Sequence, residues 1–351
     1  MPDPIGRLPE GDWPADGLES VPRCPVCGCA QREVLYDDLR DWTFASAPGV
    51  WTLVRCRDCG AAYLDPRPTP TTIGLAYRRY YTHEVPRGPL RTLYRRLTRA
   101  LLDAAHRRYF GTDHGIGDAL LAATAQVALR LRRRTGILAA ERRHIPPGWR
   151  GRLLDVGCGS GDFVAMARAW GFEAVGVDVD PVAVRQAQAK GLDVRLGGVE
   201  ALDPATERFD GITMSHVLEH VHDPIDGLRR CAALLRPGGW VWIETPNVEA
   251  PGHARYGRHW RGLEAPRHLV IWSARALERA LRATGFDRWE WLPLRSVCAF
   301  TFPASEAIAA RVGCPRRTGP EELARWVQAA EAVSAPEARE FLVLRAWRLQ
   351  P

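Results

Sequence analysis

The sequence has little that would place the chain in a membrane or in an oxidising compartment. It has no run of 18 or more uncharged apolar residues, so we expect no helix that spans a bilayer. The first residues, MPDPIGRLPEGDW, are acidic and rich in proline and have no apolar core, so we expect no secretory signal. Nine cysteines in 351 residues do not make a disulfide scaffold. These absences favour a cytoplasmic protein with reduced cysteines.

Lysine is almost absent, and Lys190 is the only one, so the net charge of +7 comes almost entirely from arginine. Arginine in place of lysine is not informative by itself, but its distribution is. Residues 87–152 contain fifteen arginines and four acidic residues. The net charge of this segment is therefore +11, which exceeds the +7 of the whole chain. Three interpretations stay open for this segment: a lid over an acceptor pocket, a surface for RNA or lipid headgroups, or a solvated helix face.

The length and an apolar content of 46% predict a globular chain of two or three domains. Residues 1–20 read as a flexible lead-in. Residues 21–65 carry paired cysteines among β-prone residues, and 71–148 have apolar residues at helical spacing, broken at 111–117. From residue 150 to 351 the pattern changes to short apolar runs that alternate with helical stretches.

The last domain therefore has the pattern of an α/β fold with a mostly parallel sheet of seven strands. The expected strands are Leu153–Val156, Glu173–Val177, Leu192–Leu196, Phe209–Met214, Trp240–Thr245, Phe286–Leu292 and Phe341–Trp347. We expect a helix over Ala274–Thr284, which ends at Gly285.

A glycine-rich turn follows the first of these strands. Gly157, Gly159 and Gly161 have no side chains, so the turn can be tight and a ligand can lie against bare backbone. The helix that follows presents free N–H groups to an anionic ligand. Asp178 falls at the end of the next strand, where a carboxylate can accept hydrogen bonds from ribose hydroxyls.

The spacing G-x-G-x-G, with Asp155 just before it, differs from the G-x-G-x-x-G of dinucleotide-binding proteins. It resembles motif I of class I S-adenosylmethionine (SAM) methyltransferases, which have a Rossmann-like fold. The resemblance implies that Asp155 orients the amino group of SAM. It also implies that the glycines lie under the methionine part and that Asp178 holds the ribose.

Two further segments match the family in order. Residues 209–220 resemble its fourth strand and the loop under the transferable methyl group, which includes Ser215, and residues 234–247 resemble its fifth strand. After the third strand, relatives often carry Gly-Asp, whose carboxylate binds the adenine amino group. Here Val199 and Glu200 stand in this region, so Glu200 or a backbone carbonyl takes that part.

Two copies of C-x-x-C-G carry four candidate metal ligands, Cys24, Cys27, Cys56 and Cys59. Four thiolates suit a tetrahedral structural Zn²⁺ ion without an open position, as in a zinc ribbon. A redox-active thiol pair is the alternative, but it does not need two copies. The other cysteines, except Cys29 beside the first pair, are expected to be small buried residues.

The whole layout resembles a bacterial group of methyltransferases with an N-terminal zinc ribbon. The ribbon is followed by Tyr63–Pro68, then by the run from Tyr80 to His83, and then by the SAM domain. Members of this group are linked to sugars, cell-surface polysaccharides or natural products, so the resemblance implies an acceptor of that kind.

Two histidines are candidates for a general base toward an oxygen or nitrogen acceptor. His216 follows the fourth strand of the sheet, and His268 lies in the loop after the fifth, where similar family members carry Pro-x-His. A structural role is the alternative for each. Glu219 and His220 are expected to be structural. His216 and His220 have the i, i+4 spacing of metal ligands, but no third ligand is evident, so we expect no metal there.

The loop before His268 also carries two aromatic residues and two arginines, Tyr256, Trp260, Arg261 and Arg267. Two interpretations stay open: a platform for a sugar ring that bears a phosphate, or packing of the loop itself.

The favoured hypothesis is a SAM-dependent methyltransferase for a small molecule such as a nucleotide sugar, a glycan or a natural product. An RNA methyltransferase is one alternative, and a non-catalytic scaffold that binds SAM or zinc is another. Contact with a membrane surface stays open, as do the oligomeric state and the acceptor atom.

Overall fold

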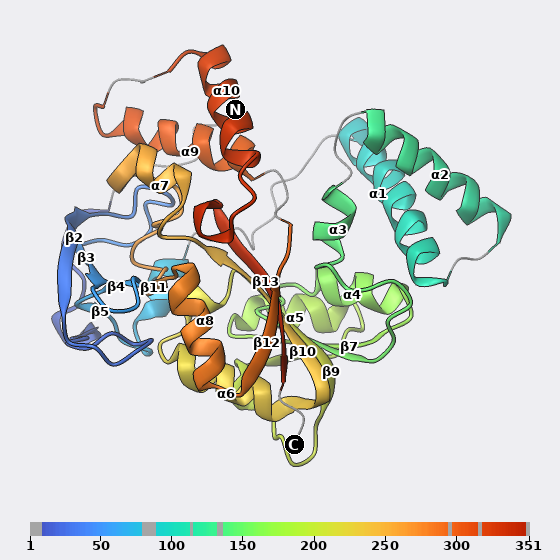
Figure 1. Ribbon diagram of the computed structural model, residues 1–351, viewed down its shortest axis with the longest axis horizontal. Coiled ribbons are helices and arrows are strands. Elements are labelled where there is room, and N and C mark those ends of the chain that lie inside the picture. The colour runs from blue at the N-terminus through green and yellow to red at the C-terminus, as the bar shows by residue number, and fades with distance from the viewer. Residues whose placement is uncertain are drawn as a thin grey trace. The chain divides into compact units, whose positions relative to one another are not determined.

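The computed structural model describes residues 9–78, 89–112, 115–131, 136–293, 297–314 and 318–348. The chain forms two compact units (Figure 1). One unit comprises residues 1–80, 215–232 and 243–349, and the other comprises residues 81–214, 233–242 and 350–351. The predicted motif residues from Tyr80 to His83 lie outside the described residues. None of the helices in the described ranges has the length and apolar character that a membrane span requires.

The central element is a seven-stranded sheet, in the order β12-β13-β10-β9-β6-β7-β8. Its strands are β6 (Arg152–Val156), β7 (Glu173–Asp178), β8 (Val194–Leu196), β9 (Phe209–Ser215), β10 (Leu235–Pro246), β12 (Phe286–Trp291) and β13 (Phe341–Arg348). β6 pairs in parallel with β7 and β9, and β7 with β8, whereas β12 and β13 are antiparallel. The predicted Rossmann-like, mostly parallel sheet is confirmed, and each of the seven predicted strands is present.

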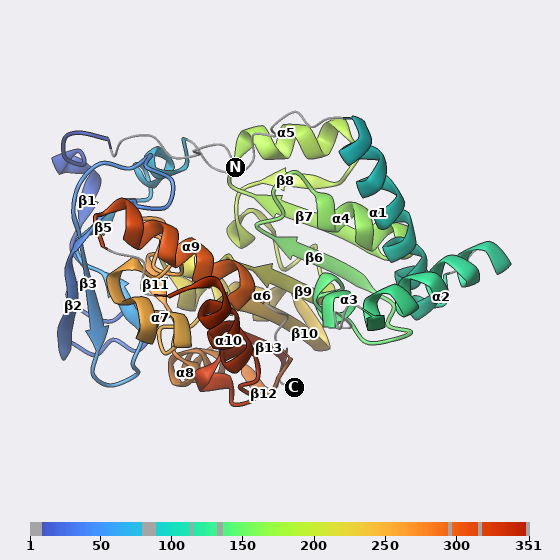
Figure 2. The same cartoon turned by 90° about the horizontal axis from the view of Figure 1, so that it is seen from above.

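Helices connect the parallel strands. α4 (Asp162–Ala169) links β6 to β7 and α5 (Pro181–Ala189) links β7 to β8, as Figure 2 shows. α6 (Pro224–Leu234) precedes β10. Asp180 caps α5 by accepting a hydrogen bond from the Val182 amide at 2.8 Å, and proline occupies the first helical position. The predicted helix at 274–284 is confirmed as α8 (Ala274–Ala283), which Ser273 caps.

The segment before this sheet is helical, as predicted. It contains the 3₁₀ turn η2 (Ile73–Tyr77), α1 (Pro89–Phe110), α2 (Ile116–Leu131) and α3 (Gly136–Glu141), and the predicted break separates α1 from α2. Aromatic contacts hold the end of α1. The His106 ring stacks on Trp170 with centroids 4.8 Å apart, and Phe110 contacts both Trp170 and Phe172.

Several arginines of this basic segment make defined contacts. The Arg142 guanidinium lies 3.6 Å from the centre of the Tyr109 ring, and burial lowers the Arg142 pKa. Arg152 forms an ion pair with Glu173 at 2.7 Å. Arg143, described below, is also paired. These arginines therefore contribute to packing and ion pairs within the chain.

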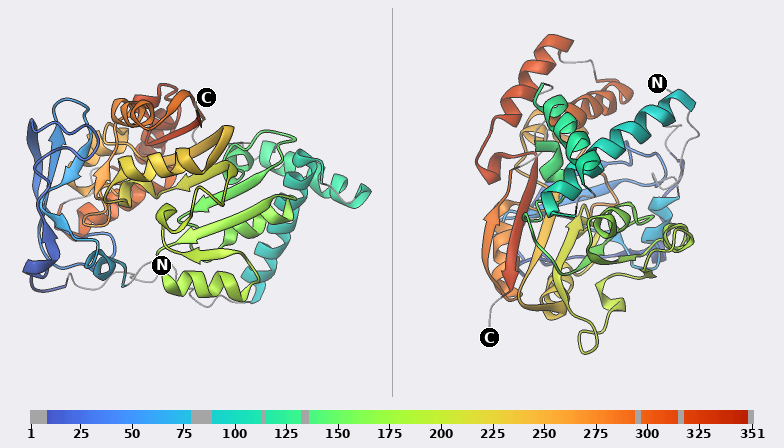
Figure 3. Two further views of the ribbon diagram at one scale, coloured as in Figure 1. Left: turned by 90° about the horizontal axis from the view of Figure 1, so that it is seen from below. Right: turned by 90° about the vertical axis from the view of Figure 1, so that its right-hand side faces the viewer.

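The paired cysteines lie beside a second, four-stranded sheet with the order β11-β4-β3-β2: the first pair precedes β2, and the second spans the end of β3 and the turn to β4. β2 (Arg32–Leu39), β3 (Trp51–Cys56) and β4 (Ala62–Leu64) form an antiparallel meander, drawn in blue in Figure 3. The fourth strand, β11 (Val270–Ile271), comes from the far end of the sequence and pairs with β4. Its two residues are too few to give a strand pattern, so the sequence did not predict it.

The expected flexible lead-in at residues 1–20 is wrong for its described part. Leu18–Glu19 form strand β1, which pairs with β5 (Arg67–Pro68). Trp13 is buried and packs edge-on against Trp51, with centroids 5.3 Å apart. Burial of the large Trp13 ring offsets the entropy that this segment loses on ordering.

The remaining helices are α7 (Pro251–Tyr256), α9 (Cys298–Arg311) and α10 (Pro320–Glu331), with short 3₁₀ turns at Ala15–Gly17, Val199–Ala201, Leu218–His220, Gly257–His259 and Pro336–Ala338. α7 and α9 pack near the cysteine-bearing sheet, and their apolar residues join its core, which includes Tyr256, Cys298 and Phe302. Cys158, Cys231 and Cys298 are buried, as expected, but Cys314 is half-exposed because it follows the end of α9.

We predict that Trp170→Ala destabilises the chain by about 3–5 kcal/mol, because it leaves a cavity between α1 and the helices beside the sheet. Trp326→Ala is the matched control, since Trp326 is 46% exposed, and it should cost less than about 1 kcal/mol. Urea unfolding followed by tryptophan fluorescence measures both. Equal losses would show that Trp170 does not hold α1.

Candidate cofactor and active site

The glycine turn after β6 is built on left-handed backbone. Gly157, Gly159 and Gly161 have φ values of 66°, 53° and 79°, which side chains strongly disfavour. The amides of Gly157 and Cys158 both donate to the Val177 carbonyl, at 2.8 and 3.1 Å. The turn is thus tied to the end of β7, the strand that carries Asp178.

The three glycines have different surroundings. A methyl group on Gly161 would lie 2.6 Å from the Leu192 side chain, so this glycine permits close packing against the α5–β8 connection. A methyl group on Gly159 would meet no atom within 4 Å. Gly159 therefore leaves open space above the turn, in which a ligand can contact the backbone.

Asp178 fixes the turn through its carboxylate. Its Oδ2 accepts the Gly159 amide at 2.7 Å, and its Oδ1 accepts the Asp180 amide at 2.8 Å. Burial raises the Asp178 pKa, although these two hydrogen bonds oppose the shift. Each oxygen keeps a second lone pair that can accept a hydroxyl proton.

Asp155 is a buried carboxylate of which one oxygen, among the described residues, has hydrogen-bond donors and the other has none. It is 1% exposed, and burial raises its pKa. Its Oδ1 accepts hydrogen bonds from Thr213 Oγ1, at 3.0 Å, and from Arg143. Its Oδ2 has no hydrogen-bond partner among the described residues. An unpartnered buried carboxylate oxygen is costly, so it suits a ligand that brings an ammonium group.

Arg143 was not predicted as a site residue, because the sequence showed it only as one arginine of a basic segment. Its guanidinium lies 3.7 Å from the centre of the Phe163 ring and donates to Thr213 at 2.7 Å as well as to Asp155. Its backbone is left-handed, with φ of 49°, which is uncommon for a residue other than glycine. The pair Arg143–Asp155 places both signs of charge beside the glycine turn.

The other predicted cofactor residues lie at the ends of β8 and β9. Val199 is buried in the 3₁₀ turn after β8, and Glu200 Oε1 accepts the Gly198 amide at 2.8 Å. Ser215 is the half-buried last residue of β9. No contact among the described residues tests the predicted roles of these residues toward adenine or methyl.

His216 directly follows β9 and has an unusual backbone. Its φ is 54°, and its amide donates to the Glu244 carbonyl at 2.8 Å. Its Nδ1 lies 3.3 Å from Glu219 Oε1, and its side chain is 33% exposed. A buried carboxylate that binds Nδ1 orients the ring and leaves Nε2 as the atom that can accept a proton.

His268 lies in a more enclosed environment. It is 5% exposed, its Nδ1 is 2.8 Å from the Gly262 carbonyl, and its ring centroid is 4.8 Å from that of His220. Burial lowers the His268 pKa to about 4. Glu219 is fully buried and accepts Thr245 Oγ1 at 2.9 Å. Burial raises the Glu219 pKa, but His216 and the other histidines outweigh this and hold it at about 2.

The expectation of a sugar-phosphate platform in the loop before His268 is wrong for its two central residues. Trp260 is 1% exposed and donates its indole N–H to Glu340 at 2.7 Å. Arg267 is fully buried and forms a double hydrogen bond with Asp41. These groups are used in packing, the other interpretation that the sequence left open.

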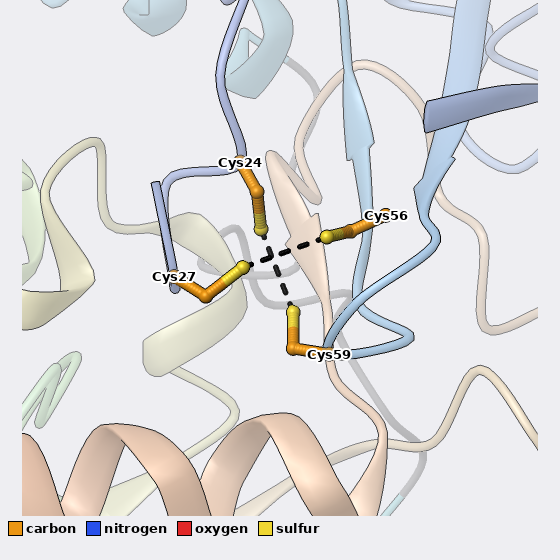
Figure 4. A group of neighbouring side chains, drawn as sticks. All are labelled: Cys24, Cys27, Cys56 and Cys59. Atoms are coloured by element: carbon orange, nitrogen blue, oxygen red, sulfur yellow. Dashed lines mark hydrogen bonds between the residues drawn. The ribbon is translucent and has the colours of Figure 1, made fainter. Parts of the chain in front are cut away.

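The four predicted metal ligands converge. Figure 4 shows the sulfur atoms of Cys24, Cys27, Cys56 and Cys59 pointing toward one another. The sulfurs of Cys24 and Cys59 are 3.6 Å apart and those of Cys27 and Cys56 are 3.5 Å apart. Tetrahedral Zn–S bonds of about 2.3 Å place sulfurs about 3.8 Å apart, so the donor set fits that ion.

Residues 93–290, more than half of the chain, match the family model described as a methyltransferase domain. The chain belongs to the class I SAM-dependent methyltransferases. The family binds SAM, and the local geometry fits its three parts. Asp155 Oδ2 suits the amino group, the open backbone at Gly159 suits the methionine part, and Asp178 suits the ribose.

Curated relatives of this methyltransferase include enzymes named ubiquinone biosynthesis O-methyltransferase. That of Albidiferax ferrireducens is 30% identical over 167 residues, which cover 41% of this chain and 66% of the relative. That of Bordetella avium is 41% identical over 104 residues, which cover 27% and 43%. The chain thus spans less than two thirds of these relatives' own length.

Solved structures similar to this methyltransferase include a SAM-dependent methyltransferase of Thermotoga maritima. It is 19% identical with a TM-score of 0.42, covering 65% of this chain and 95% of that one. Another is the 1,6-didemethyltoxoflavin-N1-methyltransferase of Burkholderia thailandensis, 22% identical with a TM-score of 0.35, covering 76% and 94%.

We predict that Asp178→Ala weakens SAM binding about 10- to 100-fold, because it removes charged hydrogen-bond acceptors for the ribose and releases the Gly159 amide. Asp193→Asn is the control, since Asp193 is an exposed carboxylate that pairs with Arg195 on the surface. Calorimetry measures both dissociation constants. An unchanged affinity in Asp178→Ala would remove the ribose assignment.

Proposed function

We propose that this methyltransferase transfers a methyl group from SAM to a small-molecule acceptor. The observation that supports a SAM site most directly is the buried, unpartnered Oδ2 of Asp155 beside an open glycine turn. Bound SAM supplies an electrophilic sulfonium methyl group. The chain's part is then to align that group and an acceptor and to exclude water.

Individual residues have separate parts in holding SAM. Asp155 accepts hydrogen bonds from the amino group of SAM, and the Arg143 guanidinium beside Asp155 attracts the carboxylate group of SAM. Asp178 accepts the ribose hydroxyls. Val199 and Glu200 lie beside the adenine, and Ser215 lies in the loop under the methyl group. These two roles follow from the resemblance to the family.

A hydroxyl group on a small molecule is the acceptor that we favour. The relatives of this chain are named O-methyltransferases, and the family layout points to sugars, glycans or natural products. An RNA acceptor is less well supported, because Arg142, Arg143 and Arg152 are engaged in packing and ion pairs. A scaffold without turnover stays as the third hypothesis, and the cytoplasmic location stays a prediction.

For the general base we favour His216 over His268. His216 is a third exposed, and the Glu219 carboxylate holds its Nδ1. His268 is 5% exposed and sits between Glu219, Glu264 and His220, so an acceptor has little access to it. Its lowered pKa also makes it a weak base.

We further propose that residues 21–65 form a structural zinc ribbon, that 71–148 form a basic helical segment, and that 150–351 form the catalytic domain. The convergence of four sulfurs without an open position supports the structural assignment of the ion. The family match begins at residue 93, so it includes part of the helical segment.

Incubation with radiolabelled SAM and a fractionated cell extract tests the function. We expect label in small, nuclease-resistant molecules. Label confined to nuclease-sensitive material would favour the RNA alternative. SAM binding without transfer to any fraction would favour the scaffold.

We predict that His216→Gln lowers kcat about 100- to 10,000-fold with the acceptor found in that assay, because proton removal is lost. SAM affinity should stay within about twofold, as calorimetry would show. His222→Gln is the control, since His222 bonds the Pro68 carbonyl outside this cluster. A kcat that His216→Gln leaves unchanged would exclude His216 as the base.

We predict that Cys59→Ala lowers the zinc content by one ion per chain and lowers the melting temperature by several degrees, because a structural ion contributes directly to folding. Cys29→Ala is the matched control, because Cys29 lies beside the cluster but bonds Gln31 instead. Elemental analysis and thermal unfolding measure the effect. Retention of the zinc ion in Cys59→Ala would contradict the ligand set.

A further inference from the structure

A second group of metal-ligating side chains lies away from the cysteines. Glu219, His220 and His268 each place one ligand atom so that all three lie within 4.8 Å of one another. Ligands about 2.1 Å from a common ion are separated by about 3 to 4.2 Å, so small side-chain rotations bring these three into range. Glu219 and His268 are buried, and His220 is half-buried.

The hydrogen bonds of both histidines define the same tautomer. His220 Nδ1 is 2.9 Å from the Arg267 carbonyl, and His268 Nδ1 is 2.8 Å from the Gly262 carbonyl. A carbonyl only accepts, so each Nδ1 carries the proton and each Nε2 carries a lone pair. The Tyr77 hydroxyl oxygen, also 2.9 Å from His220 Nδ1, then accepts from the same N–H. Metal-binding histidines are commonly oriented in this way by a backbone carbonyl.

The carboxylate is oriented as well. Glu219 Oε2 accepts the Thr245 hydroxyl at 2.9 Å, and Oε1 lies 3.3 Å from His216 Nδ1. The Glu219 backbone carbonyl accepts the Leu269 amide at 2.8 Å, which ties the turn after β9 to the residue next to His268. Each Glu219 oxygen therefore accepts one hydrogen bond and keeps a second lone pair for an ion, whereas the two histidines are held through Nδ1 and keep Nε2 for it.

The neighbouring charges favour a cation. Glu264 Oε2 lies 3.6 Å from His268 Nε2, but Glu264 also forms ion pairs with Arg261 and Arg267, which balance its charge. Arg267 is in turn paired with Asp41. In the described part of the chain, the groups that face the Glu219 carboxylate are the Thr245 hydroxyl and the imidazoles of His216, His220 and His268. A fully buried carboxylate beside two lone-pair nitrogens suits a bound cation.

We propose that Glu219, His220 and His268 bind one divalent first-row transition-metal ion. Two imidazoles and one carboxylate suit Mn²⁺, Fe²⁺ or Zn²⁺, and they leave positions open for water or an acceptor oxygen. Thiolates select softer ions, so the cysteine cluster and this site differ in preference. Through Glu219 the ion is joined to His216, and this link to catalysis rests on the proposed function.

From the sequence alone we expected no metal here, because the pair His216 and His220 had no evident third ligand. The fold supplies that ligand from 48 residues further along the chain, through the loop that ends at β11. In the proposed site His216 is not a ligand but a hydrogen-bond partner of the carboxylate.

Electron paramagnetic resonance with Mn²⁺ tests the proposal on the full chain loaded with one equivalent of zinc, which the cysteine cluster takes up because thiolates select the softer ion. We expect one bound Mn²⁺ per chain and, in the pulsed spectrum, couplings to nitrogen atoms of imidazole. His268→Gln and Glu219→Gln should each weaken Mn²⁺ binding at least about 10-fold. His253→Gln is the matched control, because His253 is a half-buried histidine that bonds Val248 and Tyr36.

Absence of Mn²⁺ binding, or binding without nitrogen couplings, would overturn the proposal. So would equal affinity in His268→Gln and the control, provided that circular dichroism shows both variants folded. SAM binding measured by calorimetry on the same samples keeps the two proposals apart. Failure to bind SAM with intact Mn²⁺ binding would remove the proposed function and leave the metal site.

Discussion

The carboxylates at the ends of two neighbouring parallel strands are the constraint on which the cofactor site depends. Asp155 on β6 is buried and Asp178 on β7 is half-buried, and a carboxylate that loses contact with water needs hydrogen-bond donors. The glycine turn supplies one of them, because the Gly159 amide points to Asp178. The shape of the turn and the position of the acidic groups are therefore set by the same hydrogen bonds.

Burial of charge also organises the unit that carries the cysteines. Arg267 is fully buried, and its pair with Asp41 joins the loop before β11 to a residue 226 positions earlier, while its pair with Glu264 lies within the loop. Breaking one partner of a buried pair leaves an uncompensated charge, so this loop has little freedom. His268 follows Arg267 directly, and its place beside Glu219 and His220 depends on that anchoring.

The sequence predicted the regular elements well because their patterns are local. Alternating apolar runs and glycine turns gave the seven strands and α8, and the C-x-x-C-G repeats identified four ligands that converge in the structure. It did less well where an element is short or its partner is distant. β11 has two residues and no pattern, and the lead-in containing Trp13 is ordered by contacts with distant residues, including the packing of Trp13 on Trp51 and the pairing of β1 with β5.

The sequence by itself determined the chemistry that neighbouring residues carry: a turn that accepts a ligand on bare backbone, an acidic group one strand away, and paired thiols. Tertiary structure decided which distant side chains meet. It brought Arg143 to Asp155 and placed His268 beside Glu219. It also buried Arg267, which the sequence had left as a candidate for binding a phosphate. The physical reason is that periodicity and turn chemistry act over a few residues, whereas these contacts depend on the path of the whole chain and on the need to pair buried charges.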